Sequence, residues 1–148
     1  MITSVVIIIL SVAMFVYWFR YSCVLILDSR WNEDEALAVA NQNDLSFGTI
    51  DETLAQVESM EAMDRVKDLL DRDLNRVVSL LDCCPAVAET GQSLECRMLM
   101  LDYQIMRAWY AVTRSFASPK AHQALREMAH IVGYIAGEYG SQMSTART

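Results

Sequence analysis

The stretch that decides the fold is VVIIILSVAMFVYWFRYSC, which runs from Val5 to Cys23 and carries a single charge, Arg20. It belongs to an uncharged run that extends from Ile2 to Phe19. At about 1.5 Å per residue, a helix over this run is roughly 27 Å long, which is close to the hydrocarbon thickness of a bilayer. The length therefore favours a membrane-spanning helix.

Two other interpretations of this run are weaker. A cleavable secretion signal has basic residues before its apolar core and small residues at its exit. Here the core has no Lys or Arg before it and is followed by the bulky sequence Tyr17-Trp18-Phe19-Arg20-Tyr21. A helix that is apolar all round in a soluble fold would need burial on every side. We therefore predict a membrane anchor with Tyr17, Trp18, Arg20 and Tyr21 at the membrane interface, Arg20 reaching to the headgroups.

The positions of the basic residues predict the orientation of this anchor. Arg20 and Arg30 follow the apolar run, and only the α-amino group precedes it. The positive-inside rule then places the rest of the chain on the cytoplasmic side of the cell's inner (plasma) membrane. The four cysteines follow neither a zinc spacing nor a secreted disulfide framework, which agrees with a reducing compartment. Adjacent Cys83 and Cys84 could form a redox pair, but we favour two small residues that end a helix.

Composition predicts an all-α fold. Apolar residues make up 53% of the chain, whereas Gly and Pro together number only seven (5 + 2), too few for a turn-rich β fold. The net charge of −7 disfavours a nucleic-acid partner, because phosphate binding needs a basic face. The segment from Asp51 to Asp82 holds nine acidic and four basic residues, which we interpret as a solvated face rather than a docking site for a basic partner.

Apolar periodicity predicts where the helices lie. We expect residues 21–41 to continue the anchor helix as a stalk, and "NQNDLSFGT" (residues 41–49) to end it. A capping box of Thr49 and Glu52 then opens a long helix that ends before Cys83. Further helices start at Ser93 and at Ser118, where Pro119 suits a first turn.

Each of these three later helices has an apolar stripe with steps of three and four residues. The first stripe comprises Leu54, Val57, Met60, Met63, Val66, Leu70, Leu74, Val77 and Leu81; the second, Leu94, Met98, Leu101, Ile105, Ala108, Val112 and Phe116; the third, Ala121, Leu125, Met128, Val132, Ile135 and Tyr139. Three stripes with short connections predict an antiparallel three-helix bundle. The expected domains are an anchor (1–27), a juxtamembrane helix and linker (28–50), the bundle (51–140) and a flexible tail (141–148).

The sequence carries no recognisable catalytic motif. Glu127-x-x-His130 matches half of a di-iron carboxylate motif, but the other half is missing, and His122 has no glutamate three residues before it. A haem between a methionine and one of the two histidines is conceivable, although no Cys-x-x-Cys-His occurs for covalent attachment. We therefore expect no enzyme, no metal, no cofactor and no small-molecule substrate.

The helices after Ser93 offer candidates for a protein interface. The first, "MLMLDYQIMRAWYAV", is apolar nearly all round, and the second has a small-residue stripe of Ala129, Gly133 and Gly137. The predicted partner contacts are Tyr103, Met106, Trp109, Tyr110, Gly133 and Gly137. The alternative is that a single chain buries these residues in its own core.

The segments "YWFRYSCVLIL" and "SLECRMLMLDYQIMRAWYAVTR" resemble small single-pass bacterial membrane proteins of uncharacterised function. The resemblance covers about a third of the chain and implies a bacterial inner-membrane context, but no residue roles. The predicted function is a membrane-anchored helical interaction module: a scaffold, an accessory subunit or an assembly factor that binds a protein partner or a second copy. The alternative is a tethered bundle that carries a haem or a metal redox group.

Overall fold

The structure is a computed structural model that describes residues 1–29, 33–82, 92–116 and 118–146. These residues form helices without any strand, which confirms the predicted all-α class. In chain order the elements are α1 (Ile2–Ser29), α2 (Glu33–Asn43), the 3₁₀ helix η1 (Phe47–Thr49), α3 (Ile50–Gln56), α4 (Met60–Asp82), α5 (Gln92–Thr113) and α6 (Ser118–Ala146). Cys83, Cys84, Arg30 and Trp31 lie outside the described residues.

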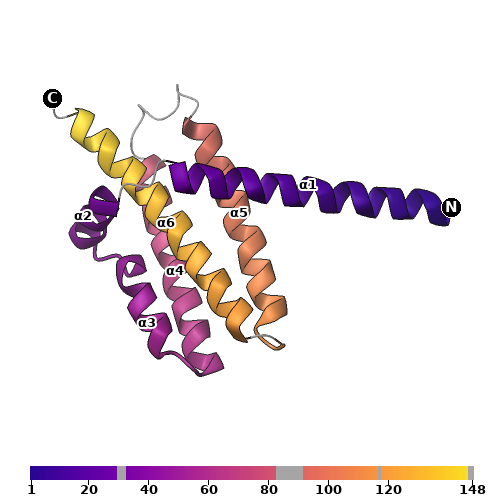
Figure 1. Cartoon of the computed structure of the whole chain (residues 1–148). Helices are drawn as coiled ribbons and strands as arrows, with labels where there is room; N and C mark the ends of the chain where they lie inside the picture. The colour runs from indigo at the N-terminus through magenta and orange to yellow at the C-terminus, as the bar shows by residue number, and fades with distance from the viewer. Residues whose placement is uncertain (30–32, 83–91, 117, 147–148) are drawn as a thin grey trace.

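The centre of the domain is α6, which contacts every other helical element of the described chain. Figure 1 shows α6 running through the bundle, with α2 and α3 on one side, α5 on the other and α4 behind it in this view. The seven consecutive residues 131–137 are all buried, as expected for a helix that is covered on every side. The arrangement is therefore a central helix with surrounding helices, rather than three equivalent members of a bundle.

The structure differs from the predicted stalk, which was a single helix continuing from the anchor over residues 21–41. Instead of continuing as one helix to residue 41, α1 ends at Ser29, and α2 packs against α6 through Ala36, Val39 and Ala40. The described residues 33–50 thus pack as part of the domain. Asp44 ends α2 with a φ of 53°, and the Leu45 amide donates to the Ala40 carbonyl at 3.0 Å, which is a Schellman-type C-cap.

The predicted long helix after Thr49 is two helices. Val57 has extended backbone angles (φ −92°, ψ 109°), so α3 ends there, and α4 starts after Ser59, whose hydroxyl accepts from the Ala62 amide at 3.3 Å. His122 of α6 donates from Nε2 to the Val57 carbonyl at 2.9 Å and holds this break against the core. The capping box is also wrong, because the Thr49 hydroxyl bonds to the Ser46 carbonyl and caps no amide.

The apolar stripes of the first and third predicted helices are largely buried, but that of α5 is not. The side chains that α5 turns into the core are Cys96, Leu99, Tyr103, Met106 and Tyr110. The predicted stripe remains outside, with Leu94, Leu101, Val112 and Phe116 exposed. Helix α5 therefore has two apolar faces. The apolar spacing predicted that the face which is exposed in the structure would be the buried one. The tail expected over residues 141–148 is helical as far as Ala146.

Candidate functional site at the junction of α1 and the helical domain

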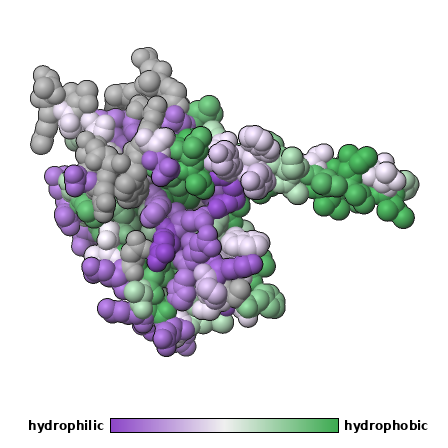
Figure 2. Space-filling model, viewed as in Figure 1, coloured by the Kyte–Doolittle hydropathy of each residue, from purple (hydrophilic) through white to green (hydrophobic). Residues whose placement is uncertain are grey.

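Helix α1 consists of two parts with different surroundings. Its amino-terminal part projects away from the domain with its apolar side chains exposed (Figures 1 and 2). Its carboxy-terminal part crosses the bundle: Cys23 is fully buried, and Phe19, Ile26 and Leu27 pack against the core. The helix is long and apolar enough to cross a membrane. One helix thus combines a free apolar segment with a segment that is part of the folded domain.

Arg20 lies at the boundary between these two parts and pairs with the domain. Its Nη1 is 3.1 Å from Oδ1 of Asp102 on α5, and its Nη2 contacts Oε2 of Glu127 on α6. The same guanidinium lies against the sulfur of Met106. Three helices are joined through one side chain, so that the position of α1 on the domain is defined by charge as well as by apolar packing.

Asp102 explains why α5 needs this arginine. The carboxylate side chain is only 2% exposed, and Arg20 is the cation that contacts it. Burial raises the pKa of Asp102, and the nearby Glu127 raises it further, whereas Arg20 opposes both effects. Without α1 the domain would contain a buried carboxylate with no counter-charge. The junction is therefore part of the folded state of the domain.

The predicted interfacial residues divide into two groups. Tyr17, Trp18 and Tyr21 are exposed on α1, as an interfacial position would require. Arg20 does not extend freely toward headgroups, because its guanidinium is held by Asp102 and Glu127. The physical reason is that Asp102 is buried, and a buried carboxylate is costly to leave without a counter-charge.

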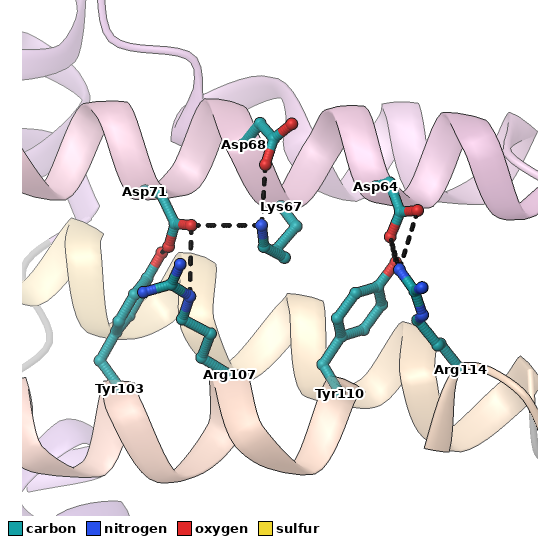
Figure 3. A network of polar contacts seen from close by, with 8 residues as sticks. All are labelled: Asp64, Lys67, Asp68, Asp71, Tyr103, Arg107, Tyr110 and Arg114. Carbon is teal, nitrogen blue, oxygen red and sulfur yellow. Dashed lines mark hydrogen bonds and ion pairs between the residues drawn. The ribbon is translucent and has the colours of Figure 1, made fainter. Parts of the chain in front are cut away.

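A second polar system joins α4 to α5 and repeats every seven residues (Figure 3). Tyr103 donates to Oδ1 of Asp71 at 2.8 Å, and Arg107 lies 3.4 Å from Oδ2 of the same carboxylate. Two turns away, Tyr110 donates to Oδ1 of Asp64 at 2.8 Å, and Arg114 binds the two oxygens of Asp64 at 2.8 and 3.0 Å. Each cluster consists of an aspartate from α4 and a tyrosine–arginine pair from α5.

These clusters account for much of the acidic character of α4. Asp64 and Asp71 face basic side chains of α5, and Lys67 lies 2.8 Å from Asp68 and 3.4 Å from Asp71. The hydrogen bond from Tyr110 lowers the pKa of Asp64. Asp73 is fully buried and accepts from the backbone amides of Ser46 and Phe47 at 2.6 and 3.1 Å. The excess of acidic residues is therefore used largely inside the chain.

The predicted partner contacts lie mostly inside the chain. Tyr103, Met106 and Tyr110 are at most 4% exposed, and they face α4, α6 and α1. Gly133 and Gly137 lie in or at the end of the buried segment of α6. Trp109 is different, because 48% of it is exposed. Of the six candidates, only Trp109 is available to another molecule in this conformation.

A groove lies between the projecting part of α1 and the adjoining faces of α5 and α6. Its volume is about 580 Å³. The side chains that line it include Val16 and Arg20 of α1, Ile105, Trp109 and Val112 of α5, and Lys120 of α6. Apolar side chains of α1 and α5 thus share one continuous surface, with a lysine at its border.

The described part of the chain contains no cluster of three or more His, Cys, Asp or Glu side chains arranged to hold a metal ion. The Glu127 and His130 pair does not form the nucleus of such a site, because Glu127 pairs with Arg20. His122 is bonded to the Val57 carbonyl. The described cysteines Cys23 and Cys96 are buried as free thiols, and burial raises the pKa of Cys96 to about 11.

The residues that matter most here carry signals that the sequence analysis did not use. Asp102 is a single acid in an otherwise apolar stretch of α5, which indicates a buried charge that needs a partner. The pairs Asp64/Asp71, Tyr103/Tyr110 and Arg107/Arg114 each have a spacing of seven residues, as expected for two facing helices.

Comparison with known proteins adds no family to this description. No protein-family model, no curated protein and no solved structure matches the chain.

Proposed function

We propose that the chain is a single-pass membrane-anchored helical interaction module: a non-catalytic scaffold, accessory subunit or assembly factor of a membrane complex. The observation that carries the proposal is the division of α1 into a projecting apolar part and a part that is docked in the domain. In the proposed arrangement the projecting part spans the inner membrane, and the domain lies on the cytoplasmic side.

The ion pairs of Arg20 support a module whose anchor and domain act as one body. A flexible tether would allow the domain to turn freely, whereas contacts of one side chain with Asp102 and Glu127 hold it at a defined orientation to the bilayer. A defined orientation is useful for presenting one face of the domain to a protein partner or to a second copy. A fixed orientation to the bilayer would give no advantage to an enzyme whose substrates are dissolved in the aqueous phase.

Fractionation tests the anchoring. The full chain should float with membranes and resist alkaline carbonate, because the projecting part of α1 would be embedded in hydrocarbon. Release of the intact chain by carbonate, or a mature amino terminus beyond Phe19, would contradict the proposal. Protease added to spheroplasts should spare the domain, and digestion from outside would reverse the proposed orientation.

Purification in a mild detergent tests the interaction role. A stoichiometric membrane-protein partner, or a stable homo-oligomer, should co-purify with the full chain and be identified by mass spectrometry. The matched control is the Arg20→Met variant, which retains the anchor but loses the ion pairs that hold the domain at a defined orientation to it. A monomer without any partner, or a visible absorption band from a bound haem or metal, would favour the alternative of a tethered redox carrier.

A further inference from the structure

The exposed apolar side chains of the domain are concentrated on one helix. Beyond α1, eight large apolar side chains of the described chain are exposed, and five of them lie on α5 or in the turn after it. These five are Leu94, Leu101, Trp109, Val112 and Phe116. Because residues at i, i+4, i+7 and i+11 share a face, Leu101, Ile105, Ala108 and Val112 form one stripe, which we call the outer face of α5.

This outer face is continuous with the anchor. Val16 of α1 lines the same groove as Ile105, Trp109 and Val112, so apolar side chains of the two helices adjoin there, together with the polar Arg20, Lys120, Gln123 and Glu127. In Figure 1, α1 crosses α5 and projects from the side of the bundle on which α5 lies. A bilayer that contains the projecting part of α1 therefore meets α5 first.

The distance between the groove and Arg20 along α1 matches the depth to which interfacial helices are buried. Val16 lies four residues before Arg20 along α1, which is about 6 Å at the helical rise. An amphipathic helix that lies in the membrane interface buries its apolar face by about 5–10 Å. A bilayer surface near the level of Arg20 would thus cover the outer face, while the paired Arg20, Asp102 and Glu127, of which Glu127 also lines the groove, would lie at the level of the headgroups. Trp109 would take the interfacial position that tryptophan prefers.

The charges around the outer face favour an anionic surface. No acidic residue occurs between Tyr103 and Arg126, an interval that contains Arg107, Arg114, Lys120 and, at its end, Arg126. Arg107 and Arg114 pair with Asp71 and Asp64 of α4, so the charge argument rests on Lys120. Lys120 borders the groove itself. Basic side chains near a membrane surface are attracted to anionic lipids, and Lys120 supplies such a charge beside the outer face.

We propose that the outer face of α5 docks on the membrane surface beside the anchor, in contact with anionic lipid, so that the domain lies flat on the bilayer. The proposal rests on the membrane anchoring proposed above. In this arrangement, those surfaces of α2, α3 and α4 that point away from α5 remain accessible to a protein partner.

Quenching of tryptophan fluorescence by brominated lipids tests this contact. The full chain with Trp18→Phe and Trp31→Phe keeps Trp109 alone and is reconstituted in phosphatidylcholine–phosphatidylglycerol vesicles with brominated acyl chains. The matched control adds Trp109→Phe and Asn75→Trp, which moves the single tryptophan to an exposed position on α4. Trp109 should be quenched several-fold more strongly by bromolipid than the control, and less by aqueous iodide.

The outcomes are separable. Equal bromolipid quenching of both tryptophans would overturn the proposal. Shielding from iodide without bromolipid quenching, dependent on the protein-to-lipid ratio, would show that a second copy covers α5 and would also overturn it. In the Leu101→Glu/Val112→Glu variant, bromolipid quenching of Trp109 should fall to the control level while helicity stays unchanged; persistence of the quenching contradicts the proposal. Failure of the chain to float with vesicles would refute the anchoring itself, independently of α5.

Discussion

Replacement of Arg20 by methionine should release α1 from the domain. The side chain keeps much of its length and loses its charge, so Asp102 remains buried without a counter-charge. Two opposite charges about 4 Å apart attract by about 4 kcal/mol at an effective dielectric constant of 20. The Arg20 side chain is 25% exposed, which screens part of this, so we expect docking to weaken by about 2–3 kcal/mol.

Thiol labelling at Cys23 measures this change directly. Cys23 lies on the docked part of α1, is fully buried against the domain and reacts only when α1 leaves it, so its labelling rate follows the undocked population. A loss of 2–3 kcal/mol corresponds to an increase of roughly 30- to 150-fold in that rate. Cys96, which is 6% exposed, serves as the internal control because it reports on opening of the domain itself. Mass spectrometry reads the two sites separately.

The double variant Arg20→Met/Asp102→Asn distinguishes charge from packing. It removes both charges, so most of the slow labelling of Cys23 should return. Acidification should have a similar effect on Arg20→Met alone. The pKa of Asp102 is raised in the folded state, so the cost of its buried charge is present above that pKa and is relieved as the pH falls through it toward the unfolded value. An unchanged Cys23 rate in Arg20→Met at neutral pH would refute the reasoning.

Three further predictions concern stability. Tyr110→Phe should cost about 1 kcal/mol in chemical unfolding because it removes one hydrogen bond to a carboxylate. Since the pKa of Asp64 is lowered, its contribution is present above its unfolded value and lost as the pH falls through the folded value, and Tyr110→Phe should reduce this acid sensitivity. Asp44→Gly should stabilise the chain by about 0.5–1 kcal/mol, because glycine adopts a positive φ without strain; a lower Tm would contradict this. A chain that starts at Phe15 should leave the membrane but keep the Tm of the domain, whereas one that starts at Asp28 should have a lower Tm.

Periodicity predicted the parts of the fold that depend on local pattern. The apolar run of α1, the buried stripes of α4 and α6, and the starts of α5 and α6 follow directly from residue spacing. The break at Val57 was not predictable in this way, because the apolar spacing continues across it and a tertiary hydrogen bond from His122 stabilises it.

The errors on α5 have a different physical cause. A helix that is apolar on two faces gives two acceptable stripes, and spacing alone does not say which one meets the core. Tyr103 and Tyr110 are turned inward because their hydroxyls find Asp71 and Asp64 on α4, which satisfies the polar atoms of a buried tyrosine. The contact of Arg20 with Asp102 joins residues 82 positions apart, and only the fold brings them together.

The central place of α6 has a consequence for synthesis. A ribosome makes α1 first and α6 after all the other helices described here, yet α6 is the helix on which each of them packs. If α1 is the membrane anchor proposed above, it can therefore enter the bilayer while α2 to α5 still lack their common core. The domain closes only after the 29 residues of α6 have emerged, on a nascent chain that the proposed anchor would already hold in the membrane.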